Sequence, residues 1–292
     1  MNFEEFKDKT MAEIKNRLPK EYEDYEVVTK AVKKINKVTS VIFLQNHMEK
    51  AVRPMVYIEE LYEKYKNSGS FDHTVDFAIC VLTGTPDVPD IEAVKRGIDD
   101  YRNRVVFQLI NKEKNQELLK EVVSRDYLDM ALIYRIEFSN DNNHTAFAII
   151  SKKFVENCGV TEDELFEIAY RNTFEKNSFD VMSISEVLRG DTKDIYEDET
   201  LLIIASKSFV HGAAAIINTD ILKKVSDVLG GSLHVICSSV YELLVYKEGT
   251  VDVNEMKKVV KDINDNFASE SDVLSYSIYS YDKDADKVEI LA

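Results

Sequence analysis

The residues Leu-Asp-Met-Ala-Leu-Ile-Tyr-Arg-Ile-Glu-Phe at positions 128–138 form the strongest strand pattern in this chain. The run is rich in aliphatic, β-branched and aromatic side chains, which favour extended backbone. A polar cluster follows at 139–143, and a second β-rich run occupies 145–150. Two such runs around a short polar turn predict an antiparallel hairpin.

Similar patterns recur on both sides of this hairpin. Paired β-rich runs predict hairpins at 27–32 with 38–44 and at 274–281 with 287–291. Single strands are predicted at 54–57, 105–110, 201–205, 213–217, 233–237 and 242–246, and helices at 3–17, 61–65, 71–82, 90–102, 112–119, 161–171, 183–188, 220–229 and 253–264. Strands that come in hairpins, rather than alternating strictly with helices, indicate the α+β class. We therefore predict an α+β fold of antiparallel hairpins and a mixed sheet, packed with about seven to nine helices.

The clearest loop signal lies at 84–90, where two of the four prolines fall. After the helix predicted to follow it, the spacing of strands and helices changes. We therefore divide the chain into an N-terminal α+β segment, 1–102, and a C-terminal α+β segment, 103–292, and expect the two to fold as one unit.

The balance of charge argues against direct nucleic-acid binding. The 292 residues include 37 Lys and Arg and 53 Asp and Glu, a net charge of −16. Neutralising phosphates requires a basic stripe, and the sequence shows none. The N-terminus lacks the pattern of a signal peptide, and the apolar runs are too short for a membrane span. We expect a cytoplasmic protein with a protein partner and no membrane contact.

The residues that bind metals and cofactors are scattered. The three cysteines and five histidines show no metal-ligand spacing. The sequence also has no Walker A loop, dinucleotide fingerprint, nucleophile elbow, zincin helix or kinase signature. We therefore expect no metal and no cofactor.

Asp129 is the most unusual residue for its position. Alternation along the predicted strand places it on the inward face with Ala131 and Ile133. A buried carboxylate must be paired or hydrogen-bonded. We expect a structural carboxylate that pairs with Arg104 or Arg125; the alternative is a site residue, weakly a catalytic one.

Several asparagines have two interpretations. Asn111 and Asn115 are four residues apart, so Asn111 is expected to cap a helix at 112–119, with Asn115 one turn on. The alternative is a pair of amides that frame a polar binding pocket. Asn172 and Asn264 lie near predicted helix ends and are expected to cap them, with Asn172 a further candidate for binding.

Ser238, Ser239 and Glu242 form a second polar cluster. Ser239 is placed to donate to Glu242, and Tyr241 adds a hydroxyl. No histidine lies nearby in sequence to activate a serine. A serine-stabilised turn is the simpler interpretation; a binding site with Glu242 as a weak catalytic candidate is the alternative.

Tyrosines are concentrated in the last predicted hairpin. Tyr279 and Tyr281 share a strand face, with Tyr276 just before them. They are predicted to pack across strands; an interaction surface is the alternative.

Seven short strings in a fixed order are more specific than any of these features. They lie at 109–119, 127–134, 169–173, 212–214, 238–242, 259–264 and 273–275. As an ordered set they resemble an uncharacterised bacterial family, a domain of unknown function of the DUF5688 type. The resemblance covers about 3–288 and implies a single layout for the chain, without implying an activity.

The chain departs from the pattern of that family at two positions. Members tend to have a proline where this chain has Cys237 and a histidine where it has Tyr241. If that histidine acts as a general base in relatives, this chain lacks it.

Three hypotheses for function follow. We favour a non-catalytic binding or regulatory protein, because no catalytic constellation is visible. The alternative is a hydrolase or transferase in which Asp129, Glu242 and the asparagines converge on one pocket. A third hypothesis is an acidic inhibitor that occupies the basic surface of a nucleic-acid-binding protein; the interspersed lysines count against it.

Overall fold

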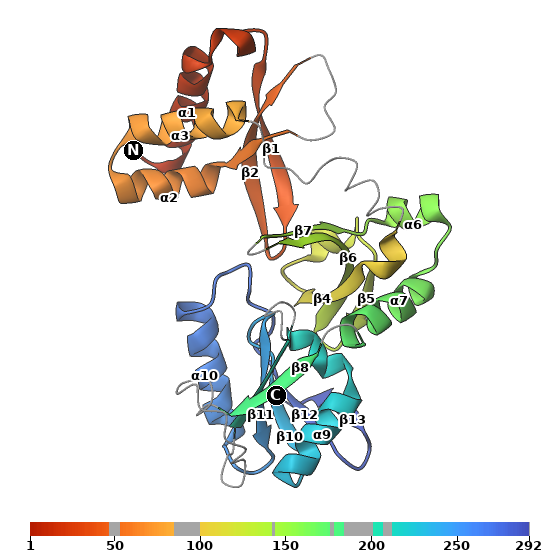
Figure 1. The fold of residues 1–292 in the computed structure, drawn as a ribbon. Helices are drawn as coiled ribbons and strands as arrows, with labels where there is room; N and C mark the ends of the chain where they lie inside the picture. Colours follow the sequence, from red (N-terminus) through yellow and green to blue (C-terminus); the bar gives the residue numbers. More distant parts are fainter. Residues whose placement is uncertain are drawn as a thin grey trace. The chain divides into compact units, whose positions relative to one another are not determined.

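The computed structural model describes residues 1–46, 53–84, 100–141, 144–175, 178–183, 201–206 and 212–291. The chain forms two compact units, Met1–Ile91 and Glu92–Ala292. Both contain helices and antiparallel strands, so the α+β class is confirmed (Figure 1). All strand pairings among the described residues are antiparallel, so the predicted mixed sheet is wrong on this point.

Unit 1 packs three helices against a three-stranded sheet. In chain order its elements are α1 (Phe3–Arg17), the 3-10 turn η1 (Lys20–Tyr22), β1 (Glu26–Lys34), β2 (Lys37–Gln45), β3 (Met55–Tyr57), α2 (Ile58–Ser68) and α3 (Phe71–Thr83). The sheet order is β1-β2-β3. Asn2 begins α1 with a capping box, and Gly69 ends α2 in the left-handed conformation. Phe6, Ile42 and Leu61 lie in the shared core.

Unit 2 contains two sheets. Its elements are η2 (Tyr101–Asn103), β4 (Val105–Asn111), α5 (Gln116–Leu119), β5 (Ser124–Tyr127), β6 (Met130–Asp141), β7 (His144–Ile149), α6 (Lys152–Cys158), α7 (Glu162–Phe174), β8 (Phe179–Ser183), β9 (Leu201–Ser206), η3 (Gly212–Ile217), α9 (Thr219–Leu229), β10 (Leu233–Ile236), β11 (Glu242–Lys247), α10 (Val253–Asn266), β12 (Ile278–Asp282) and β13 (Lys287–Ile290). One sheet has the order β4-β6-β5, with β7 also paired to β6. The other has the order β13-β12-β10-β11-β9-β8.

The two sheets of unit 2 share one hydrophobic core. Phe107 and Tyr134 of the first sheet belong to the same buried cluster as Leu202 and Val235 of the second. On the other face of the six-stranded sheet, α10 packs through a smaller cluster that includes Met256.

The predicted 128–138/145–150 hairpin is confirmed as β6 and β7, but its start is wrong. Leu128 and Asp129 form a tight turn between β5 and β6, and Leu128 adopts a positive φ of 56°. The sequence 124–127 pairs with β6 as a separate short strand. The predicted strand is therefore too long by the two turn residues. A turn position of this kind usually carries Gly or Asn, and because Leu128 is apolar the sequence pattern assigns it to the strand.

Other boundaries also differ. The helix predicted at 112–119 begins only at Gln116, because Asn111 Oδ1 accepts from Lys114 N and favours a turn at 112–115. The strand predicted at 213–217 is the buried 3-10 helix η3, whose alanines have low strand propensity. β8 was not predicted. The predicted helices at 90–102 and 183–188 fall largely outside the described residues.

Close backbone packing explains why η3 begins with a glycine. A Cβ built on Gly212 would lie 1.8 Å from the carbonyl oxygen of Tyr241. That contact is with backbone, which cannot swing away as a flexible side chain can. The first residue of η3 must therefore lack a side chain.

We predict that Gly212→Ala lowers the free energy of unfolding by about 1–3 kcal/mol, the usual cost of forcing a group into filled space. Urea unfolding of the full chain measures it. Gly231→Ala is the matched control, because a Cβ there meets only the flexible Lys247 side chain at 3.5 Å. Equal stability of the two variants would contradict the packing argument.

Candidate functional site

Asp129 lies at the tip of the β5–β6 turn and not on an inward strand face. Three hydroxyl groups donate to its carboxylate. Ser275 Oγ and Ser277 Oγ lie 2.8 and 2.9 Å from Oδ2, and Tyr279 OH lies 2.6 Å from Oδ1. We call Asp129 and these three donors the hydroxyl cluster. It ties a turn of the first sheet to the strand β12 of the second, across about 150 residues of sequence.

The predicted arginine partners are wrong. Arg125 instead forms a bidentate pair with Glu162 at 2.6–3.2 Å and contacts Asp163. Arg104 lies 3.8 Å from Asp100. The three hydroxyl donors satisfy the hydrogen-bonding capacity of the Asp129 carboxylate, and its partial exposure to solvent lets the charge stand without an arginine.

The stretch before β12 is held from several sides. Asn111 Nδ2 donates to the carbonyl of Leu274 at 3.0 Å, and Asn264 Nδ2 donates to that of Ser275 at 2.9 Å. The backbone N–H groups of Leu274 and Ser275 donate to the carbonyl oxygens of Ser238 and Cys237, respectively. The hydroxyl cluster therefore rests on a fixed backbone.

Cys237 lies beside the cluster and is fully buried. Burial raises the pKa of its thiol well above the usual value, and the charge of Asp129 raises it further. A thiol that keeps its proton is a poor nucleophile and a poor metal ligand. Cys237 therefore acts here as a packing residue.

A shallow pocket of about 390 Å³ opens next to the cluster. Its lining consists of Asn111, Lys112, Glu113, Gln116, Asp129, Tyr276 and Ser277. The structure thus brings Asn111 and Asp129 together, and Asn115 stands behind them, donating to the Asn111 carbonyl at 2.7 Å. The other predicted site residues, Asn172, Ser238, Ser239 and Glu242, do not line this pocket.

Ser239 and Glu242 form a turn of their own. Ser239 Oγ donates to Glu242 Oε1 at 2.7 Å and accepts from the backbone N–H of Tyr241 at 3.2 Å. Ser238 and Ser239 are both buried. These contacts are those of a serine-stabilised turn between β10 and β11.

Two asparagines expected to cap helices lie inside them instead. Asn172 is 2% exposed, and α7 runs past it to Phe174. Its Nδ2 donates to the carbonyls of Arg102 and Val105 at 3.0 and 2.9 Å. Asn264 likewise lies within α10 and reaches Ser275. Each side chain joins its helix to a neighbouring segment, a long-range contact that no local pattern predicts.

The tyrosines of the last hairpin are buried. Tyr279 and Tyr281 are fully covered and belong to the core of unit 2, so the interaction-surface alternative is wrong for them. Tyr281 OH donates to Asp286 at 2.7 Å. Tyr276 is exposed and donates to Asp265.

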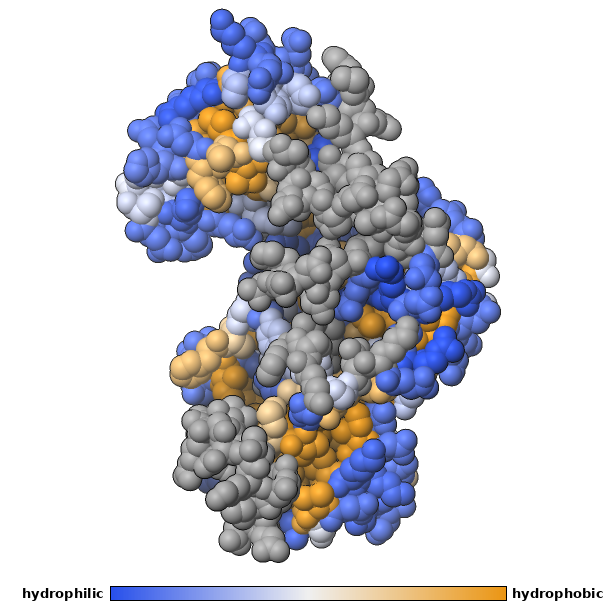
Figure 2. Space-filling view, viewed as in Figure 1, coloured by the Kyte–Doolittle hydropathy of each residue, from blue (hydrophilic) through white to orange (hydrophobic). Residues whose placement is uncertain are grey.

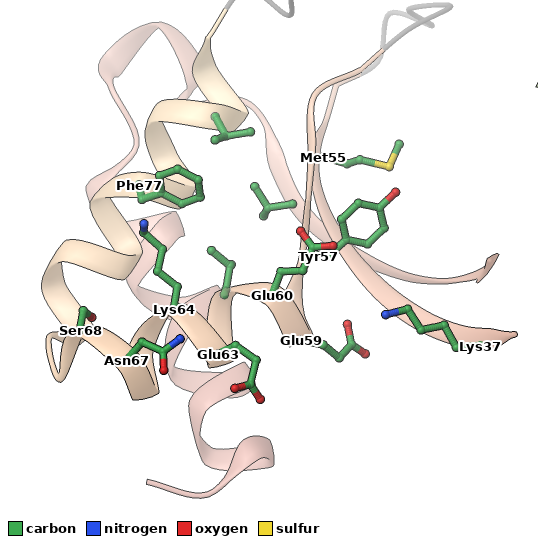
Figure 3. Close-up of a pocket in the computed structure, with 13 residues that line it drawn as sticks. Lys37, Met55, Tyr57, Glu59, Glu60, Glu63, Lys64, Asn67, Ser68 and Phe77 are labelled. Carbon is green, nitrogen blue, oxygen red and sulfur yellow. The ribbon is translucent and has the colours of Figure 1, made fainter. Parts of the chain in front are cut away.

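Unit 1 holds a larger groove that the sequence reasoning missed (Figure 3). Its volume is about 960 Å³. Its lining consists of Lys37, Met55, Val56, Tyr57, Glu59, Glu60, Leu61, Glu63, Lys64, Asn67, Ser68, Phe77 and Val81. We call this site the β3 groove. Met55 and Phe77 are each 44% exposed, a large fraction for such apolar side chains.

A signal for the β3 groove exists in the sequence of α3. Thr74, Val75, Ala78 and Leu82 form the buried stripe of that helix. Phe77 and Val81 lie four residues apart on a second line beside the stripe, so the apolar face is wider than the core requires. Figure 2 shows apolar residues reaching the surface of unit 1 among hydrophilic ones.

The carboxylates of the β3 groove are already engaged. Glu59 accepts from Thr39 Oγ1 at 2.5 Å and from the backbone N–H of Ser40. Glu60 lies 3.7 Å from Lys34, and Glu63 lies 2.5 Å from Lys66. Lys64 instead places its ammonium 4.4 Å from the centre of the Phe77 ring, toward the interior of the groove (Figure 3).

Neither site has the geometry of a metal centre. Within the described ranges, no group of three or more His, Cys, Asp or Glu side chains is placed to hold a metal ion. No helix within these ranges has the length and apolarity needed to cross a membrane.

Comparison with known proteins finds one family. The model of a family of unknown function, DUF5688, matches residues 3–283. No curated protein and no solved structure matches the chain.

We predict that Asp129→Asn lowers the free energy of unfolding by about 2–4 kcal/mol, because the amide leaves at least one buried hydroxyl without an acceptor. Urea unfolding checks this. Asp126→Asn on the neighbouring strand β5 is the matched control, since its side chain is 71% exposed and its loss should cost less than about 0.5 kcal/mol. A loss below that size at Asp129 would refute the structural role.

A second prediction concerns alkaline pH. Burial raises the pKa of Tyr279, and the Cys237 and Asp129 neighbours raise it further. The stability that the neutral phenol contributes is complete below about pH 10, where an unfolded tyrosine begins to ionise, and is lost as the pH rises. Tyr279→Phe should make the fall in stability above pH 10 shallower, by up to about 1.4 kcal/mol per pH unit.

Urea unfolding between pH 8 and pH 11 measures this slope. The control is Tyr276→Phe, whose ring is exposed and should change the slope less. Identical slopes for wild type and Tyr279→Phe would contradict the prediction.

Proposed function

This chain belongs to the DUF5688 family, whose function is unknown, and we propose that it is a non-catalytic binding protein whose partner docks in the β3 groove of unit 1. The observation that carries the proposal is a groove of about 960 Å³ whose lining includes two half-exposed apolar side chains, Met55 and Phe77. Apolar groups left open to water in this way mark interaction sites on folded proteins.

The state of the predicted catalytic residues supports binding over catalysis. The Asp129 carboxylate already accepts from three hydroxyls, and Glu242 accepts from Ser239. The enzyme hypothesis requires Asp129 and Glu242 to line one pocket, and Glu242 is not part of the pocket at Asp129. A structural role in holding turns together accounts for these contacts, so no catalytic role is needed to explain them.

Cytoplasmic residence forms part of the proposal. Cys80 and Cys158 are free and exposed, and Cys237 is free and buried. Exposed free thiols are typical of proteins in a reducing compartment. In that compartment, a cytoplasmic partner protein would have access to the β3 groove.

Selection of random short peptides on the immobilised full-length chain tests the proposal. We expect peptides that bind the wild type and lose binding to Phe77→Glu, because a carboxylate in the apolar wall is costly to bury. Val228→Glu is the matched control, since Val228 is an exposed apolar residue of α9 in unit 2. Failure to select any Phe77-dependent peptide would overturn the proposed function.

A further inference from the structure

The β3 groove follows the open edge of a sheet. Met55, Val56 and Tyr57 all line it, although successive residues of a strand point to opposite faces. A groove that touches three consecutive strand residues must therefore border the edge of the strand. Among the described residues, β3 pairs only with β2, and no described strand pairs with its other edge. The edge of a sheet presents backbone donors and acceptors for another strand.

The far wall of the groove is helical. Leu61 and Lys64 come from α2, and Phe77 and Val81 from α3; Figure 3 shows Lys64 and Phe77 on these helices. A groove between an edge strand and a helix suits an extended peptide, which adds to the sheet by backbone hydrogen bonds and fits its side chains into the walls. The backbone supplies affinity there, and the wall residues supply specificity.

In the described part of the chain, three charged residues of the lining have no ion-pair partner: Lys37, Lys64 and Glu59. Glu59 accepts hydrogen bonds from Thr39 and Ser40 instead, so the charge left without an ion pair is net positive. Glu60 and Glu63 pair with Lys34 and Lys66, which lie outside the lining. No carboxylate in the described part of the chain lies within ion-pair distance of Lys64, whose ammonium stays over the Phe77 ring. A cation beside an apolar wall is complementary to a carboxylate that follows or precedes an apolar side chain.

We propose that the β3 groove binds an extended segment of a partner protein that pairs with β3, packs apolar side chains against Met55 on one face of the sheet and Phe77 on the other, and places a carboxylate on Lys64. This inference rests on the proposed function and adds the chemistry of the partner to it. A basic segment would bring its cations to Lys64 and lose affinity, so the groove distinguishes acidic from basic segments.

The test starts from peptides selected on the full-length chain. The selected sequences should be enriched in Asp or Glu next to an apolar residue. A synthetic version of the most frequent peptide is then titrated, with binding followed by fluorescence anisotropy. Lys64→Met, which keeps the length and removes the charge, should weaken binding about tenfold, as expected for the loss of one charge-assisted hydrogen bond.

Lys20→Met is the matched control. Lys20 lies in η1 of the same unit, is exposed and is not part of the groove lining, so its variant should bind within about twofold of wild type. Methylation of single backbone amides of the peptide tests the strand pairing. It should weaken binding at alternate positions, because only every second residue of an added strand faces β3.

The outcomes separate the two proposals. Peptides that depend on Phe77 but are basic, or bind Lys64→Met as tightly as wild type, would overturn the acidic partner and leave the β3 groove as a binding site. Phe77-dependent peptides that tolerate methylation at every position would overturn the strand pairing. The absence of Phe77-dependent peptides would overturn the proposed function itself.

Discussion

The architecture of unit 2 depends on how one carboxylate is satisfied. Asp129 leaves its own sheet at a tight turn, and its partly exposed carboxylate needs hydrogen-bond donors. It finds them on the segment leading into β12, from Ser275, Ser277 and Tyr279. Since that segment belongs to the other sheet, satisfying the carboxylate fixes the β5–β6 turn to the six-stranded sheet at the rim of the shared core.

Side-chain amides extend the same principle through unit 2. Asn111, Asn172 and Asn264 each donate to backbone carbonyls of another segment, where secondary structure leaves those groups without partners. Residues that look like a scattered active site are thus the connections between elements. These contacts account for the polar side chains inside unit 2, and the binding site proposed above lies in unit 1.

The β3 groove leaves apolar side chains exposed that the core of unit 1 would cover. Core side chains such as Phe6 and Ile42 are fully covered, whereas Met55 and Phe77 remain half exposed beside an edge strand. Leaving such groups in water costs free energy that a folded unit recovers when a partner covers them. Lys64 adds a charge that its own helix does not neutralise, so the groove has both an apolar and an electrostatic preference.

The α+β class, the hairpins and most helices follow from the sequence, because hydrophobic period and capping residues act over a few positions; the capping box at Thr161 is an example. The sequence also identified Asp129 as a carboxylate in need of partners. Only the tertiary structure decided what those partners are, since Tyr279 lies 150 positions away. The β3 groove likewise exists only after β3 and α3 pack together, because local periodicity carries no information about which surfaces meet.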